Sequence, residues 1–232
     1  QECVRHVVIA GRVKLVPMIA YLVLSMLLAQ EIHKGDYHKH QVPKSAEEYA
    51  KILEDPKRDG WQKPHEVVHA LEIQEGSTIA DIGAGTGYFT LHFARHVGPE
   101  GKVQAVDIDE KLLERVRKRA ADMKLANVET VLAAPNDPHL RAESVGTIFI
   151  CDVIHHIEQR PAYYELLARA LKPGGRIVII DFHKRPLPVG PRPEMKIARE
   201  DMIQELEKAG FRLAREHTFL PHQYFLVFEA KS

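Results

Sequence analysis

Residues 81–87 read Asp-Ile-Gly-Ala-Gly-Thr-Gly and stand at the junction of two regular elements. Residues 77–82 have the length and apolar composition of a buried strand, and residues 86–96 have the apolar spacing of a helix. Glycines at such a turn let the backbone approach a ligand closely. The free N–H groups at the start of the helix favour an anionic group. The sequence therefore predicts a ligand site at this turn.

The spacing of the glycines bears on which ligand the turn binds. Gly83, Gly85 and Gly87 follow Asp81 in the pattern Gly-x-Gly-x-Gly. A dinucleotide-binding turn has the pattern Gly-x-Gly-x-x-Gly, which requires its third glycine at the position of Tyr88. The spacing therefore disfavours an NAD-dependent oxidoreductase, which stays in view as a less favoured alternative.

Strands and helices alternate along the chain after this turn. Further apolar strands are predicted at residues 103–107, 128–132, 147–151 and 176–181, and further helices at residues 110–124 and 160–171. A helix at 199–209 then leads to two strand-like segments, 211–219 and 223–230, whose short connection predicts an antiparallel hairpin. The sequence thus predicts an α/β fold, with a Rossmann-like doubly wound, mostly parallel sheet and an antiparallel C-terminal hairpin.

The alternating elements occupy residues 64–232, which we expect to form the main domain. Residues 31–63 are expected to form a linker and an N-terminal cap helix, which ends near Leu53 and begins with a Ser-x-x-Glu capping box. Trp61 and Gln62 follow this helix. They are candidates for a lid over the ligand cleft, with plain packing as the alternative.

Residues 1–30 have a different character. Residues 15–29 are almost wholly apolar and are preceded by Arg5, Arg12 and Lys14, which is typical of a secretory signal or a membrane anchor. The apolar run is shorter than a usual membrane-spanning helix. We expect membrane association or export through this segment. The alternatives are a buried or partner-binding helix and a cytoplasmic protein.

The charge balance and the cysteine and histidine content indicate which kinds of ligand the protein binds. The chain has 32 basic and 32 acidic residues and lacks a long basic run, which disfavours a nucleic-acid partner and favours a small molecule. Cys3 and Cys151 are too far apart in sequence to form a Cys-x-x-Cys pair. His33, His38 and His40 have no matching ligand frame, so we predict no metal site.

The 81–87 turn resembles motif I of class I S-adenosylmethionine-dependent methyltransferases, and residues 103–107 resemble the second strand of that family. The resemblance implies that the aspartate and glycines of the turn bind S-adenosyl-L-methionine. It also implies that Asp107 holds the two ribose hydroxyls, with Ile108 beside the adenine. A carboxylate suits this role because it accepts two hydrogen bonds at once. Capping of the next helix is the alternative role for Asp107, but Asp109 can supply that cap.

Two more motifs resemble the small-molecule methyltransferases of ubiquinone and menaquinone biosynthesis. Residues 151–156, Cys-Asp-Val-Ile-His-His, resemble the loop after the fourth strand, which adds Asp152 to the cofactor-binding residues. Residues 171–175, Leu-Lys-Pro-Gly-Gly, resemble the turn before the fifth strand.

The chain departs from this pattern after the third strand. The family commonly has Gly-Asp there, with the aspartate reaching the adenine amino group, whereas this chain has Ala133 and Ala134. We predict that Asn136 or Asp137 makes the contact instead. Gly146 likewise stands where an aspartate often starts the fourth strand.

The resemblance implies methyl transfer to a small-molecule acceptor by in-line displacement. The main task of such an enzyme is to align the acceptor with the methyl group and to exclude water. A hydroxyl or carbon-acid acceptor also needs a base, for which His156 is the first candidate and His155 the second. The alternatives are a structural role for both histidines and a non-catalytic module that only binds S-adenosylmethionine.

Overall fold

The computed structural model describes residues 46–231. The predicted signal or anchor at residues 1–30 and most of the predicted linker lie outside the described residues. Within the described part, no helix is long and apolar enough to cross a membrane.

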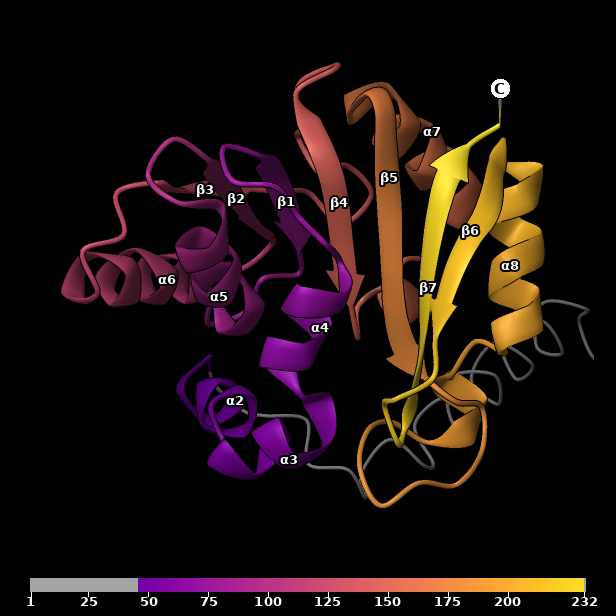
Figure 1. Cartoon of the computed structure of the whole chain (residues 1–232). Coiled ribbons are helices and arrows are strands. Elements are labelled where there is room, and N and C mark those ends of the chain that lie inside the picture. Colours follow the sequence, from indigo (N-terminus) through magenta and orange to yellow (C-terminus); the bar gives the residue numbers. More distant parts are fainter. Residues whose placement is uncertain (1–45, 232) are drawn as a thin grey trace, which may run out of the picture. The chain divides into compact units, whose positions relative to one another are not determined.

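A seven-stranded sheet forms the centre of the molecule, in the order β3-β2-β1-β4-β5-β7-β6 (Figure 1). Its strands are β1 (Thr78–Ile82), β2 (Lys102–Asp107), β3 (Val128–Leu132), β4 (Val145–Cys151), β5 (Leu171–Phe182), β6 (Phe211–His217) and β7 (Gln223–Ala230). Strands β1 to β5 are parallel, and β7 is antiparallel to both β5 and β6. The predicted Rossmann-like sheet with a C-terminal antiparallel hairpin is confirmed.

Helices cover both faces of this sheet. They are α2 (Ala46–Leu53), α3 (Asp59–Gln62), α4 (Pro64–Ala70), α5 (Tyr88–Val97), α6 (Glu110–Asp122), α7 (Arg160–Ala170) and α8 (Arg199–Lys208), with short 3-10 turns η1 (Pro56–Arg58), η2 (Ile154–His156) and η3 (Pro193–Met195). Alternate residues of each strand face opposite sides, as the pleat requires. Phe149 of β4 therefore packs with α4 and α5, while Ile148 and Ile150 pack with α7 and α8.

Two element boundaries differ from the sequence prediction for backbone reasons. Helix α5 begins at Tyr88 and not at position 86, because Gly87 precedes it with a left-handed φ of 82°. Strand β5 begins at Leu171 and includes residues 172–175, where the sequence predicts a turn. The pairing of β5 with β4 shifts register at this point, so the extra residues form an irregularity within the strand.

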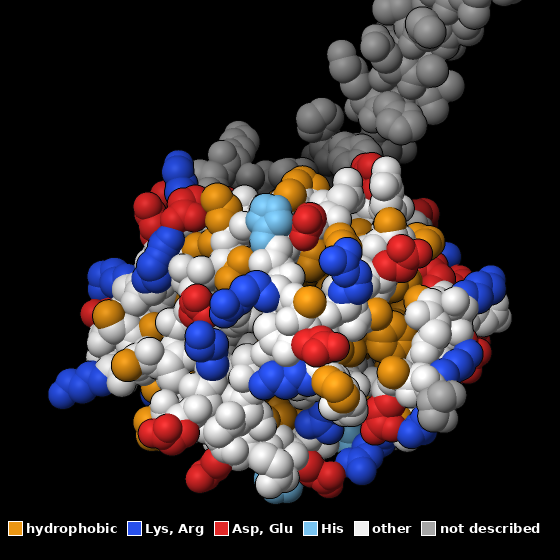
Figure 2. Space-filling view, turned by 90° about the horizontal axis from the view of Figure 1, so that it is seen from above, with side chains coloured by type: hydrophobic (Ala, Val, Ile, Leu, Met, Phe, Trp, Pro, Cys, Tyr) orange, Lys and Arg blue, Asp and Glu red, His pale blue; other side chains and the backbone are white. Residues whose placement is uncertain are grey.

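The carboxyl ends of the parallel strands lie on one side of the molecule, and the antiparallel strand β7 begins on that same side (Figure 1). In open α/β sheets, ligands bind outside the carboxyl ends of the strands. Figure 2 views the opposite edge, where acidic and basic side chains are interspersed over the surface.

Candidate functional site

A cavity of about 710 Å³ lies at the carboxyl ends of β1, β2, β4 and β5. Its floor includes the Gly83–Gly85 backbone after β1, Asp107 at the end of β2 and Asp152 after β4. One wall comes from the segment α2–η1–α3, through residues that include Arg58 and Trp61. Small-molecule sites have volumes of roughly 300–1,000 Å³, so this cavity has the size of one.

The glycine turn forms the tightest part of the cavity floor. Gly83 and Gly85 have φ values of 70° and 56°, a left-handed conformation that side chains with a Cβ rarely adopt. A Cβ on Gly83 would lie 2.1 Å from Val153 Cγ2, and one on Gly85 would lie 2.8 Å from Leu53 Cδ1. Gly87 does not line the cavity; it precedes α5 and packs near Val116. These positions therefore require glycine for both conformation and space.

Asp107 presents its carboxylate to the cavity from the end of β2. Its Oδ2 accepts a hydrogen bond from Gly85 N at 2.8 Å, and its Oδ1 accepts one from Asp109 N at 3.0 Å. Burial raises the pKa of Asp107, while these backbone donors act in the opposite direction. The predicted helix cap is Asp109, which accepts from Lys111 N at 2.9 Å. Ile108 lines the cavity beside Asp107 and is 62% exposed.

Asp81 and Asp152 are two further carboxyl groups on the cavity wall. The Asp81 side chain accepts a hydrogen bond from Thr90 Oγ1 at 2.6 Å, and burial raises the pKa of Asp81 to about 7. Burial and the charge of Asp181 raise the pKa of Asp152, also to about 7. Asp152 has a left-handed φ of 59° and lies 4.0 Å from the guanidinium of Arg58. Two buried carboxyls, Asp81 and Asp107, and the partly buried Asp152 thus line one cavity, an arrangement that favours a cationic ligand group.

A chain of amides links the α3 segment to the strand ends. Gln62 Nε2 donates to Gln223 Oε1 at 2.8 Å, and Gln223 Nε2 donates to Asp152 Oδ1 at 2.6 Å. Gln62 and Gln223 are both buried. The predicted lid position of Gln62 is therefore tied to β7 and to the loop after β4. Sequence patterns gave no signal for Gln223, because its partners are 161 and 71 residues away.

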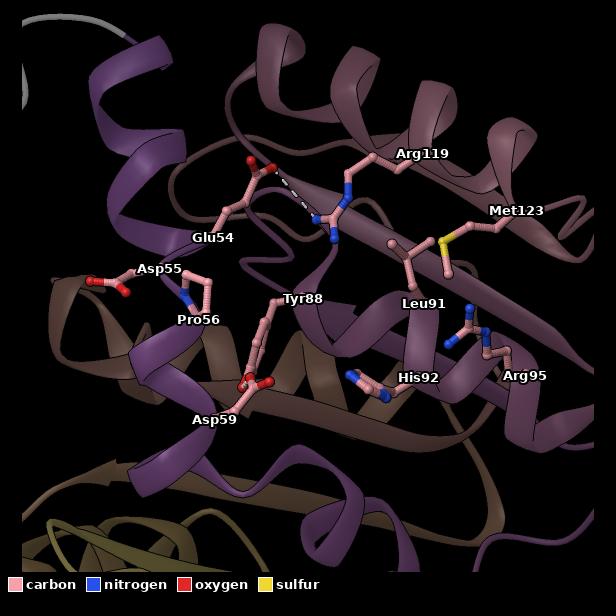
Figure 3. A pocket seen from close by; sticks show the side chains of 10 residues that line it. All are labelled: Glu54, Asp55, Pro56, Asp59, Tyr88, Leu91, His92, Arg95, Arg119 and Met123. Carbon is pink, nitrogen blue, oxygen red and sulfur yellow. Dashed lines mark hydrogen bonds and ion pairs between the residues drawn. The ribbon is translucent and has the colours of Figure 1, made fainter.

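The same segment is also fastened to α5 and α6, around a smaller hollow drawn in Figure 3. The Tyr88 hydroxyl donates to Asp59 Oδ1 at 2.6 Å, and the Arg58 guanidinium lies 4.1 Å from the centre of the Tyr88 ring. Glu54 accepts from Arg115 at 2.8 Å and lies 3.6 Å from Arg119. The α2–η1–α3 segment is thus held against the Rossmann core by charge and by a ring contact.

His155 and His156 both line the cavity from η2. The Nδ1 atom of His155 lies 2.8 and 2.9 Å from the two carboxylate oxygens of Asp181. Burial lowers the pKa of His155, but the hydrogen bond and charge of Asp181 outweigh this and raise it above its usual value. Burial and the neighbouring His155 lower the pKa of His156.

Most of the predicted site residues meet in this one cavity. Those that line it are Asp81, Gly83, Gly85, Asp107, Ile108, Asp152, His155 and His156. Asn136 and Asp137 do not line it; they lie in a turn closed by pairing of Ala134 with Asp137. Their adenine contact stays a prediction. The sequence did not predict Arg58 or Asp181 as site residues, because the contacts of each are with residues far away in the sequence.

Residues 73–217 match a family described as "Methyltransferase domain". The chain belongs to this methyltransferase family. It is 31% identical over 113 residues to the ubiquinone/menaquinone biosynthesis C-methyltransferase of Escherichia fergusonii, and 32% identical over 113 residues to that of Pseudomonas putida. These alignments cover 48% of this chain and only 45% and 44% of the two relatives.

The likeness to a solved structure covers more of the methyltransferase fold. A SAM-dependent methyltransferase from Aquifex aeolicus superposes with a TM-score of 0.75 and is 28% identical. The match covers 79% of this chain and 97% of that one. The family's cofactor is S-adenosyl-L-methionine.

S-adenosylmethionine fits the cavity in charge and in shape. It carries an ammonium, a sulfonium and a carboxylate, and its two cationic groups can offset the carboxyls of Asp81 and Asp152. Asp107 has one backbone donor on each carboxylate oxygen, and each oxygen retains acceptor capacity for a ribose hydroxyl. The left-handed glycines allow the close backbone approach that such a ligand needs.

Proposed function

We propose that this protein transfers a methyl group from S-adenosylmethionine to a small and largely apolar acceptor. One observation carries the proposal: the glycine turn with Asp107 and the two histidines line the same cavity of about 710 Å³. The cofactor and the acceptor would therefore share one space, as in-line displacement requires.

The side chains around the histidines support an apolar acceptor. Trp61 and Phe182 line the cavity with ring centroids 5.8 Å apart, and Val189 and Pro191 line it from the loop after β5. Such a wall favours a flat hydrophobic molecule and excludes water from the reacting atoms. The names of the curated relatives, which refer to ubiquinone and menaquinone biosynthesis, agree with an acceptor of this kind.

A labelling experiment tests the proposal. The full chain is incubated with methyl-labelled S-adenosylmethionine and a metabolite extract, and the labelled products are separated by size and identified. We expect label in an apolar small molecule. Label only in protein or nucleic acid would contradict the proposal. Binding of S-adenosylhomocysteine without any labelled product would favour the non-catalytic binding module.

We also propose that residues 1–30 direct the protein to a membrane or out of the cytoplasm. The basic residues before the apolar run 15–29 support this. Fractionation of cells that express the full chain tests it. Recovery of the whole protein in the soluble cytoplasm with an intact N-terminus would contradict it.

A further inference from the structure

His155 and Asp181 form a buried pair at the edge of the cavity. His155 belongs to η2 after β4, and Asp181 is the penultimate residue of β5. The side chain of His155 is 3% exposed and that of Asp181 is fully buried. The Asp181 Oδ1 atom also accepts a hydrogen bond from Phe182 N at 2.7 Å, which fixes the orientation of the carboxylate.

This pairing determines which nitrogen of His155 is free to act. A carboxylate is an acceptor only, so the 2.8 Å contact requires the proton to be on Nδ1. The Nε2 atom then keeps its lone pair in the neutral ring. No protein group in residues 46–231 hydrogen-bonds to this Nε2, and the ring lines the cavity. The structure thus presents a histidine in the tautomer that a general base needs.

His156 lacks a comparable arrangement. Its ring centroid lies 4.2 Å from that of His155, yet within the described residues its side chain has no carboxylate partner. A histidine without an orienting acceptor has no fixed tautomer, and a proton taken up by His156 would lie next to the ring of His155. The geometry therefore favours His155 over His156 as the proton acceptor.

Other charged and polar groups face this pair from neighbouring elements. Asp152 lies on the loop after β4, and the charges of Asp152 and Lys196 act on His155 together with that of Asp181. Lys196 is buried, with Nζ 5.6 Å from the centre of the Phe182 ring. Tyr224 is the register partner of Asp181, and its buried hydroxyl has no hydrogen-bond partner among the described residues. The carboxylates stabilise a protonated His155, whereas Lys196 opposes it.

We propose that His155 is the general base of methyl transfer, that Asp181 is its positioning residue, and that the acceptor carries a proton on its attacking atom. The acceptor class is then a phenol, another hydroxyl compound or a carbon acid. This inference rests on the proposed function, because it assumes that the acceptor shares the cavity with S-adenosylmethionine.

The proposed step couples proton transfer to in-line transfer of the methyl group. The proton of the acceptor passes to Nε2 of His155, and the electron pair that it leaves forms the bond to the methyl carbon. The bond from the methyl carbon to sulfur breaks, and its electron pair stays on sulfur, so that the sulfonium becomes a neutral thioether. His155 becomes an imidazolium paired with the Asp181 carboxylate and later releases its proton to solvent.

The first test measures the proton on His155 and needs no acceptor. In the full chain labelled with ¹⁵N-histidine, NMR titration is compared for wild type, Asp181→Asn and His156→Gln, with His155→Gln for assignment. We expect the Nδ1–H tautomer in wild type and in His156→Gln. Asp181→Asn should lower the pKa of His155 by about one unit or more. An Nε2–H tautomer in wild type, or an unchanged pKa in folded Asp181→Asn, would overturn the proposal.

The second test separates this inference from the proposed function. His155→Gln should lower labelling of the small-molecule product by about 100-fold or more, as expected for loss of a general base. The affinity for S-adenosylhomocysteine should stay within about twofold. The exposed His69→Gln variant, on α4 and outside the cavity lining, controls for loss of a histidine, and His156→Gln should lower labelling much less than His155→Gln.

The outcomes of the second test are distinct. If wild type binds S-adenosylhomocysteine but labels no small molecule, the proposed function fails. If wild type labels a small molecule and His155→Gln labels it equally well, the function stands and the assignment of the base is overturned.

Discussion

The two halves of the cavity are built in different ways. In the cofactor half, Gly83, Gly85 and Asp107 come from two neighbouring strand ends, and Asp107 contacts backbone 22 residues away or nearer. In the half that we propose for the acceptor, called the acceptor half below, Trp61 from α3 meets Phe182 from β5, more than a hundred residues later. The first half depends on backbone conformation and therefore on particular residue types. The second depends on packing between distant segments, which tolerates more variation.

The largest expected effect of this difference is at the glycine turn. Gly83→Ala would place a Cβ 2.1 Å from Val153 and force a left-handed φ, so binding of S-adenosylhomocysteine should fall by about 100-fold or more. Gly76→Ala is the matched control, because Gly76 has a φ of 78° but nothing within 4 Å of its Cβ position. Calorimetry and thermal unfolding measure both variants. Equal losses of binding in the two variants would show that backbone strain alone, and not the space beside Gly83, determines affinity.

Asp107 should come next in magnitude. Asp107→Ala would remove the two charge-assisted hydrogen bonds that we propose to the ribose and should weaken S-adenosylhomocysteine binding by roughly 1–3 kcal/mol. Asp109→Ala removes a carboxylate two residues away that caps α6. It should lower the free energy of unfolding by about 1 kcal/mol and leave binding nearly unchanged. Stronger loss of binding in Asp109→Ala would contradict the role given to Asp107.

The raised pKa of Asp81 predicts that stability and S-adenosylmethionine affinity depend on pH. Because burial raises this pKa from its ordinary value of 3.8 to about 7 in the folded protein, the folded form takes up a proton as pH falls towards 7. Protonated Asp81 therefore adds to the free energy of unfolding below about pH 4, and this contribution is lost as pH rises through 7. A cationic ligand needs the ionised carboxylate, so S-adenosylmethionine affinity should fall by up to tenfold per unit below pH 7.

Calorimetry between pH 5.5 and 8.5 measures this dependence. Asp81→Asn should bind more weakly at pH 8 and show a flatter profile. A wild-type affinity that is constant across this range would contradict the electrostatic account of the cofactor half.

The smallest expected effect concerns the contacts that hold the α2–η1–α3 segment. Tyr88→Phe removes the hydrogen bond to Asp59 and should lower the free energy of unfolding by about 0.5–1.5 kcal/mol. Tyr163→Phe, at a buried tyrosine on α7, is a control for loss of a tyrosine hydroxyl, although Tyr88 itself is only half-buried. Denaturant unfolding compares the two. A larger loss in Tyr163→Phe would show that the hydrogen bond contributes little.

The sequence predicted the fold, and it predicted residues of the proposed cofactor half that line one cavity, because both depend on local patterns. Strand alternation and the glycine spacing of 81–87 are read over a few residues, and they located β1, α5 and Asp107. The exception was residues 172–175, which lie within strand β5 between the pairs Leu171–Val145 and Arg176–Thr147. Gly174 keeps a left-handed φ of 74°, so a local turn conformation persists as an irregularity inside the strand.

The acceptor half was predicted only in part, because its residues are joined by long-range contacts. The 151–156 motif predicted both histidines as candidate bases with His156 first, whereas we propose His155 first. That order depends on Asp181, 26 residues from His155, which a reader of the sequence sees only as the end of an apolar strand. Arg58 likewise gave no signal, since its partners Tyr88 and Asp152 meet it only through folding.

The central claim is that the turn after β1 and the carboxylate at the end of β2 bind S-adenosylmethionine and not a dinucleotide. Titration calorimetry of the full chain with S-adenosylhomocysteine and, separately, with NAD tests it most directly. We predict saturable binding of S-adenosylhomocysteine that Asp107→Ala weakens, and no measurable heat with NAD. Binding of NAD with no response to S-adenosylhomocysteine or S-adenosylmethionine would contradict the account.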